Sequence, residues 1–256
     1  MSSSSRPGPN VLLRLEGLEQ FYDERIRILG PIDLEVLEGE FVSLVGPSGC
    51  GKSTLLRIVA GILPPTRGIL RFRERVLTGV NSHAAMVFQS FALFPWMTVV
   101  ENVGIGLEAR GIGLHERLRR SERYIALVGL AGYERAFPRE LSRGMKQLVG
   151  LARALALEPE LLCMDEPFSA LDVLTARAMR DRVLDLWQSP EIPTKTVLMV
   201  THSIEEAVAL SDRVVVLKAN PGAIADAVDL RELGRPRRPE AAGVRETVDR
   251  MYGLLA

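Results

Sequence analysis

The sequence has little cysteine, no long apolar run and no excess of either charge. Two cysteines, Cys50 and Cys163, exclude a disulfide framework and are typical of a reducing compartment, so we expect a cytosolic protein. No run approaches the roughly 18 apolar residues of a membrane helix, so a membrane role would need a partner. Lys and Arg (32) balance Asp and Glu (32), and this balance gives no reason to expect nucleic acid as a partner.

The chain divides into an N-terminal tail, a long α/β region and a C-terminal extension. Residues 1–10 are rich in Ser, Pro and Gly and predict a disordered tail rather than a signal peptide. Alternating strands and helices predict a mostly parallel sheet with helices on both faces. Residues 93–157 have helical spacing throughout and predict a helical insert. Strands are predicted at 32–36, 41–45, 85–88, 161–164, 196–201 and 213–217, a hairpin at 69–78, and helices at 54–61, 114–130 and 145–157.

After Pro221 the chain becomes rich in arginine and proline and ends in a short amphipathic segment that reaches Leu255. We interpret Arg235, Arg237 and Arg238 as part of a solvent-exposed surface turn, which is the usual place for such residues.

The stretch LVGPSGCGKSTLL, residues 44–56, has the spacing of a phosphate-binding loop between an apolar strand and a helix. Glycines let backbone N–H groups surround phosphate oxygens, and the helix N-terminus adds partial positive charge. We expect Lys52 to reach the β- and γ-phosphates of a nucleotide and Ser53 to ligate Mg²⁺. A turn that merely links strand to helix is the alternative, and the spacing and flanks disfavour it. The candidate nucleotide-binding residues here are Gly46, Pro47, Ser48, Gly49, Cys50, Gly51, Lys52, Ser53 and Thr54.

Two carboxylates end the buried strand at 161–164, at the edge where a doubly wound sheet binds ligands. Asp165 is a candidate ligand of Mg²⁺ through water, and Glu166 could orient or deprotonate the attacking water. The two acids could instead cap the next helix. The phosphate-binding loop upstream favours the catalytic interpretation.

His202 and Gln89 also follow predicted strands. His202 precedes Ser203 and Glu206, which predict a capping box, and its imidazole could bind a γ-phosphate, although a lone histidine at a strand end is more often structural. Gln89 could reach both Mg²⁺ and the attacking water. Neither residue would be informative without the other motifs.

The order of these segments resembles the ATP-binding subunit of ABC transporters over about residues 11–218, and the segment LSRGMKQ at 141–147 resembles the family's signature. The resemblance implies a RecA-like P-loop NTPase core with an antiparallel β layer, a helical subdomain at about 92–157 and an extension at 219–256. It also implies that Tyr22 stacks on adenine and that Asp172 belongs to a loop contacting an opposite subunit.

In this family two subunits pair head to tail, so the resemblance implies a dimer with a second copy or a similar chain. Ser142 and Gly144 of one subunit would then face the γ-phosphate held by Lys52 of the other, and ATP hydrolysis would drive transport. Arg143 stands where the family usually has Gly, and Leu148 where it usually has Arg. Arg143 either supplies a cation near the γ-phosphate or makes the subunit slow and dependent on its partner.

The segments FALFPWMTVVENV (91–103), MDEPFSALDVLTA (164–176) and VTHSIEEAVALSDRVVVLKANPG (200–222) resemble the importers of nitrate, sulfonate, taurine and bicarbonate. This likeness implies transmembrane permease subunits and an extracytoplasmic solute-binding protein as partners. It places the chain peripherally on the cytoplasmic face of the inner (plasma) membrane.

Aromatic residues that follow Gln89 could bind a permease helix in a groove, although apolar residues at such positions are usually core. Other functions left open are an exporter ATPase, a soluble ABC ATPase outside transport, and a nucleotide sensor without turnover. The residues that would bind the permease are Phe91, Phe94, Trp96 and Met97.

Overall fold

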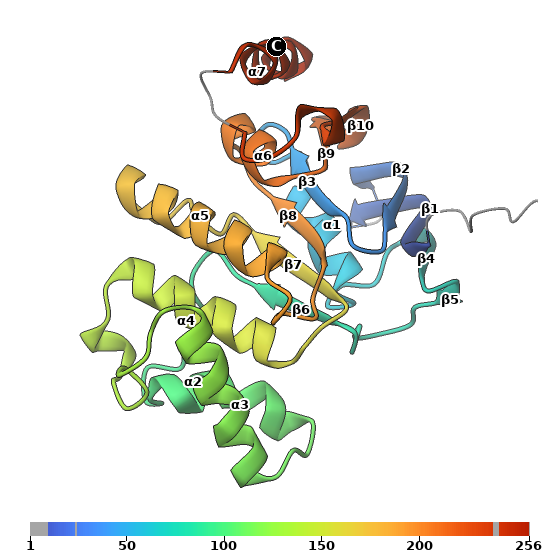
Figure 1. The fold of residues 1–256 in the computed structure, drawn as a ribbon. Helices are drawn as coiled ribbons and strands as arrows, with labels where there is room; N and C mark the ends of the chain where they lie inside the picture. The colour runs from blue at the N-terminus through green and yellow to red at the C-terminus, as the bar shows by residue number, and fades with distance from the viewer. Residues whose placement is uncertain (1–9, 24, 238–240, 256) are drawn as a thin grey trace, which may run out of the picture.

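The computed structural model describes residues 10–23, 25–237 and 241–255. The tail expected at residues 1–10 lies outside this range except for Asn10. Two sheets form the fold (Figure 1), a four-stranded antiparallel layer and a six-stranded core sheet. The antiparallel layer has the order β2-β1-β4-β5, with β1 at Val11–Tyr22, β2 at Ile26–Leu37, β4 at Arg67–Phe72 and β5 at Arg75–Val76.

The core sheet has the order β10-β9-β3-β8-β7-β6. The five strands β9, β3, β8, β7 and β6 are parallel, and β10 joins the edge of β9 antiparallel. Every residue of β3, β7 and β8 is buried because both faces are covered. These strands are β3 (Phe41–Val45), β6 (Ala84–Val87), β7 (Leu161–Asp165), β8 (Thr196–Val200), β9 (Arg213–Lys218) and β10 (Ala223–Asp229).

Alternate residues of each strand enter different cores, as the two-residue period of a strand requires. In β7, Leu161 and Cys163 pack with α1 (Lys52–Val59) and the antiparallel layer, whereas Leu162 and Met164 face the helical insert. The insert contains α2 (Val99–Ala109), α3 (Leu114–Leu127), the 3₁₀ turn η1 (Pro138–Glu140) and α4 (Arg143–Ala156). It lies opposite the antiparallel layer in Figure 1.

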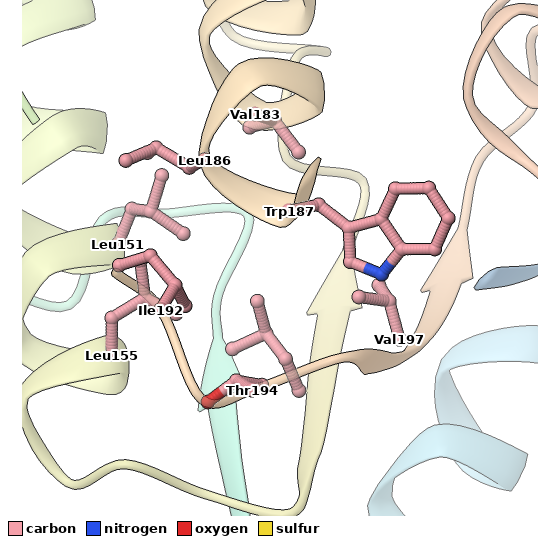
Figure 2. Close-up of a pocket in the computed structure, with 9 residues that line it drawn as sticks. Leu151, Leu155, Val183, Leu186, Trp187, Ile192, Thr194 and Val197 are labelled. Atoms are coloured by element: carbon pink, nitrogen blue, oxygen red, sulfur yellow. The ribbon is translucent and has the colours of Figure 1, made fainter. Parts of the chain in front are cut away.

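Helix α5 (Val173–Gln188) packs between the insert and the core sheet and borders a small apolar cavity (Figure 2). The cavity has a volume of about 20 Å³, which is room for one water molecule. Leu151 and Leu155 reach it from α4, and Val183 and Leu186 reach it from α5. A nucleotide cannot fit there, so the ligand site must lie elsewhere.

The C-terminal part of the chain adds β10, the 3₁₀ turn η2 (Arg231–Leu233) and helix α7 (Ala242–Leu255). Helix α7 lies beyond α6 (Ile204–Leu210) at the end of the molecule opposite the insert (Figure 1). A third core joins α6, α7, β9 and β10, and Val208, Val244 and Met251 are buried in it.

The expected solvent-exposed turn of arginines is wrong for Arg235 and Arg237, and Arg238 lies outside the described residues. Arg237 is buried, and its guanidinium donates hydrogen bonds to the carbonyls of Val208, Ser211 and Leu230. The last carbonyls of a helix have no partner within the helix. A cation is favourable beside them, so the arginine leaves solvent to satisfy the end of α6.

Candidate functional site

The loop at residues 46–51 connects β3 to α1 and is closely packed from behind. A Cβ at Gly46 would lie 2.5 Å from the Leu217 carbonyl oxygen. Gly51 has a φ of 93°, and its Cβ would lie 2.5 Å from Cδ2 of Leu29. A Cβ at Gly222, in the turn before β10, would lie 2.0 Å from the Cys50 carbonyl oxygen. The loop therefore packs so closely against its neighbours that only glycine fits at positions 46, 51 and 222.

Lys52 lies in the first turn of α1 and folds back over this loop. Its Nζ donates hydrogen bonds to the carbonyl oxygens of Gly46 at 2.8 Å and Pro47 at 2.9 Å. The N-terminus of α1 has no side-chain cap and no acidic residue in its first turn. Free N–H groups beside an ammonium group attract phosphate oxygens, so the loop can bind an anion.

Ser53 and Asp165 are in direct contact. The Ser53 hydroxyl donates a hydrogen bond to Oδ1 of Asp165 at 2.7 Å, and Asp165 is buried at the end of β7. A hydroxyl and a carboxylate are the hard oxygen donors that Mg²⁺ prefers. These two residues therefore fit the metal that the sequence predicts.

Gln89, Glu166 and His202 come together at the carboxyl edge of the core sheet. Gln89 Nε2 lies 3.2 Å from Oε2 of Glu166, and His202 Nδ1 lies 3.3 Å from the same oxygen. The Ser169 hydroxyl accepts a hydrogen bond from Gln89 at 3.2 Å and donates one to the Glu166 carbonyl at 3.0 Å. Sequence reasoning missed the place of Ser169 in this group.

Asp165 and Glu166 do not cap the next helix, which was the alternative to their catalytic role. The side chain of Asp165 contacts Ser53, and that of Glu166 contacts Gln89 and His202.

Asp172 caps α5, where it accepts hydrogen bonds from the backbone N–H of Thr175 at 3.0 Å and from the Thr175 hydroxyl at 2.6 Å. The Thr175 hydroxyl bond also lowers the pKa of Asp172.

The signature segment lies beside Asp172. Ser142 caps α4 by accepting a hydrogen bond from the N–H of Met145 at 3.2 Å. Gly144 faces the first turn of α5, since a Cβ there would lie 2.6 Å from Cγ2 of Thr175. Arg143 is exposed at the first position of α4. Ser142, Gly144 and Asp172 thus form a second group, joined by α4 and α5 rather than by the phosphate-binding loop.

The remaining loop residues and Tyr22 lie at the surface or in α1. Tyr22 ends β1 and is exposed, so the structure does not bring its ring into a pocket. Pro47, Ser48 and Gly49 are exposed at the tip of the loop, whereas Cys50 is buried. Thr54 is half-buried in the first turn of α1.

The segment after Gln89 is attached to α4 by an arginine that sequence reasoning missed. Arg153 donates hydrogen bonds to the carbonyls of Ala92 at 2.6 Å and Phe91 at 3.1 Å. Both residues have positive φ values of 47° and 60°. Beyond this clamp, Trp96 is 69% exposed and its ring packs against that of Phe94. Part of the aromatic cluster is therefore surface, while Phe91 and Met97 are half-buried.

A family model described as ABC transporter matches residues 29–169. A nitrate import ATP-binding protein of Synechocystis sp. is 47% identical over 193 residues, which span 75% of this chain and 71% of that protein. A taurine import ATP-binding protein of Mesorhizobium japonicum is 49% identical over 195 residues, which span 75% of this chain and 74% of that protein.

Solved structures show the same likeness. The dimeric post-hydrolysis structure of an ATP-binding cassette bound to ADP and phosphate is 31% identical, with a TM-score of 0.75, and the match covers 86% of this chain and 99% of that chain. These findings confirm the resemblance seen in the motifs, including the likeness to nitrate and taurine import proteins, and the predicted P-loop ABC ATPase fold. The chain therefore belongs to the ABC transporter family.

Proposed function

We propose that this chain is the ATP-hydrolysing subunit of an importer for a small polar solute of the kind its relatives are named for, nitrate or taurine. One observation carries the hydrolytic part of the proposal. The side chains of Gln89 and His202 meet at a single carboxylate oxygen of Glu166, and Asp165, the residue before Glu166, contacts Ser53 of the phosphate-binding loop.

In this proposal Lys52 exchanges its two loop carbonyls for the β- and γ-phosphate oxygens of ATP, and the N–H groups of the first turn of α1 donate to the same oxygens. Glu166 orients the attacking water and accepts its proton at Oε2. His202 and Gln89 fix the position of that carboxylate. Each residue acts from the end of a strand or the start of a helix, which gives the group a rigid support.

Ser53, Asp165 and Gln89 are the residues that would hold Mg²⁺. When bound, the ion neutralises charge on the phosphate oxygens. Ser53 and Asp165 already present their oxygens to one another, so binding would require them to turn by small amounts rather than to assemble.

The second group, Ser142, Gly144 and Asp172, supports a dimer. Ser142 is exposed beside Arg143, and nothing within the described part of the chain brings it to Lys52. A second copy or a similar chain would supply the missing contact, and a solved relative bound to ADP and phosphate is dimeric. Arg143 would then point toward the partner from the start of α4.

Exposed Phe94 and Trp96 support a contact with transmembrane permease subunits. Among the described residues, no helix combines the length and apolarity needed to cross a membrane. Because the proposed function requires contact with permease subunits, we place the chain peripherally at the cytoplasmic face of the plasma membrane. An extracytoplasmic solute-binding protein would complete the transporter.

The test compares Glu166→Gln with Glu160→Gln, a matched change at the opposite end of β7. Loss of a general base costs about 10²- to 10⁴-fold in rate, so phosphate release should fall by at least about 100-fold in Glu166→Gln and stay unchanged in the control. Light scattering with size exclusion should show a dimer of Glu166→Gln with ATP. Undiminished phosphate release would show that Glu166 is not catalytic. A monomer with ATP bound would contradict the proposed dimer.

A further inference from the structure

The helix that follows His202 is too short to fix its own orientation. Helix α6 contains seven residues, and isolated helices shorter than about 12 residues are marginal in water. Its direction must therefore come from what packs against it. Four buried residues of the C-terminal segment share a core with α6, namely Val228, Leu230, Val244 and Met251.

Arg237 holds the C-terminal end of α6. Its Nη1 bonds the carbonyls of Val208 at 3.0 Å and Ser211 at 2.5 Å, and its Nη2 bonds the Leu230 carbonyl at 2.7 Å. Within the described ranges, no carboxylate lies close enough to form an ion pair with Arg237. Burial lowers the pKa of Arg237 to about 10, so it stays charged at neutral pH and the carbonyls of α6 stabilise a buried cation.

Tyr252 holds the other end of α6. Its hydroxyl, on α7, donates a hydrogen bond to Oε1 of Glu205 at 2.8 Å. Glu205 lies in the first turn of α6, three residues after His202. Between these two contacts, Val244 and Met251 of the C-terminal segment pack into the same core as Ile204 and Val208.

The start of α6 is linked rigidly to His202. The Thr201 hydroxyl donates a hydrogen bond to Oε2 of Glu206 at 2.7 Å and accepts one from the N–H of Ser203 at 3.1 Å. These bonds join residues on both sides of His202 in the sequence, and its Nδ1 is 3.3 Å from Oε2 of Glu166. A tilt of α6 would therefore move the imidazole relative to that carboxylate.

We propose that Arg237 and Tyr252 are positioning residues for ATP hydrolysis, because they fix α6 and through it His202. The inference rests on the proposed function, in which Glu166 and His202 act on ATP. It assigns the arginine- and proline-rich C-terminal segment a role in turnover without contact with the nucleotide.

The experiment measures steady-state hydrolysis by the full-length chain carrying Arg237→Met, His202→Ala or both. A small misplacement of a reacting group can cost about 100-fold, so Arg237→Met should lower kcat roughly 10- to 100-fold while KM for ATP changes less than about twofold. If Arg237 acts through His202, the double variant should have the kcat of His202→Ala alone. Arg110→Met is the control, because Arg110 clamps the carbonyls of Leu157 and Ser82 away from His202 and should leave kcat unchanged.

Tyr252→Phe is the second variant, in case circular dichroism shows that Arg237→Met does not fold. It removes one hydroxyl and should give a smaller fall in kcat that also vanishes in the His202→Ala background. Losses that multiply in the double variants, or an unchanged kcat, would overturn the inference and leave Glu166 in its role. An unchanged kcat in His202→Ala would overturn both the inference and the assignment of His202.

Discussion

At Glu206 the predicted capping box forms only in part, because the side chain has a different partner from the one predicted. The sequence predicts a reciprocal capping box, and Ser203 does accept a hydrogen bond from the Glu206 N–H at 3.1 Å. The Glu206 carboxylate turns instead to the Thr201 hydroxyl. That choice depends on a neighbour brought close by the end of β8, which spacing alone does not encode.

Glu206→Gln should stabilise the protein at neutral pH. Burial raises the pKa of Glu206, against smaller opposing effects of the Thr201 hydroxyl and the charge of Arg180. A raised carboxyl pKa means that the folded state holds the proton longer, so this contribution to stability is present at low pH and lost as the pH rises through the folded-state pKa. The gain of Glu206→Gln in unfolding free energy should therefore be larger at pH 7 than at pH 4.5, measured by urea denaturation.

The matched control is Glu101→Gln, for which the sign is reversed. Hydrogen bonds from Thr98 lower the pKa of Glu101, so its contribution to stability is present at higher pH and lost on acidification. Glu101→Gln should lose stability, and most of it near pH 7. The same pH trend in both variants would show that one of the two carboxylates does not behave as its surroundings indicate.

Helix α4 connects the signature segment to the segment after Gln89, which the sequence analysis described separately. Ser142 caps its N-terminus and Gly144 lies in its first turn, while Arg153 in its last turn bonds the carbonyls of Phe91 and Ala92. The apolar period predicted this helix within two residues of its start at Arg143. The contact of Arg153 with two backbone carbonyls was not predictable, because it depends on how a loop with positive φ values folds over the helix.

Arg153→Met should loosen residues 90–97 without weakening ATP binding. The arginine is half-buried, and desolvation lowers its pKa, so two carbonyls would lose their charged donor at a cost of about 1.5–3 kcal/mol per bond. We expect faster amide exchange in this segment, by roughly tenfold for each 1.4 kcal/mol lost from local stability, and weaker stimulation of hydrolysis by the permease.

Arg182→Met provides the comparison, because Arg182 bonds the Leu127 carbonyl elsewhere in the helical region. It should leave exchange at 90–97 unchanged. Equal exchange in wild type and Arg153→Met would mean that the segment is held by its other contacts.

At the scale of the whole molecule, the order of motifs was enough to predict the fold. Parallel strands end at one edge, so residues as distant as Lys52 and His202 were expected to meet there, and Ser53, Asp165, Glu166, Gln89 and His202 do lie together. The burial of Arg237 was missed. It arises from tertiary contacts with the end of α6 that override the polar character of the segment.

Trp96→Ala should weaken binding of the permease and leave the free subunit's affinity for ATP intact. Trp96 is largely exposed and lies outside the buried core, and a tryptophan at the centre of an interface commonly contributes about 2 kcal/mol or more. This corresponds to roughly a 30-fold weaker complex, which co-purification and titration can detect. Val76→Ala, an exposed residue on the antiparallel layer, should have no effect. Loss of ATP binding in Trp96→Ala would instead place the ring in the structural core.

The residues that pack behind the phosphate-binding loop determine the smallest fragment of the chain in which the loop could keep its conformation. The family match ends at residue 169, and a protein truncated there would retain the whole GPSGCGKST stretch. It would lack the Leu217 carbonyl behind Gly46 and the glycine at 222 against which Cys50 rests. Nucleotide affinity therefore depends on both halves of the chain. The N-terminal half contributes the motif, and the C-terminal half contributes the residues that support it.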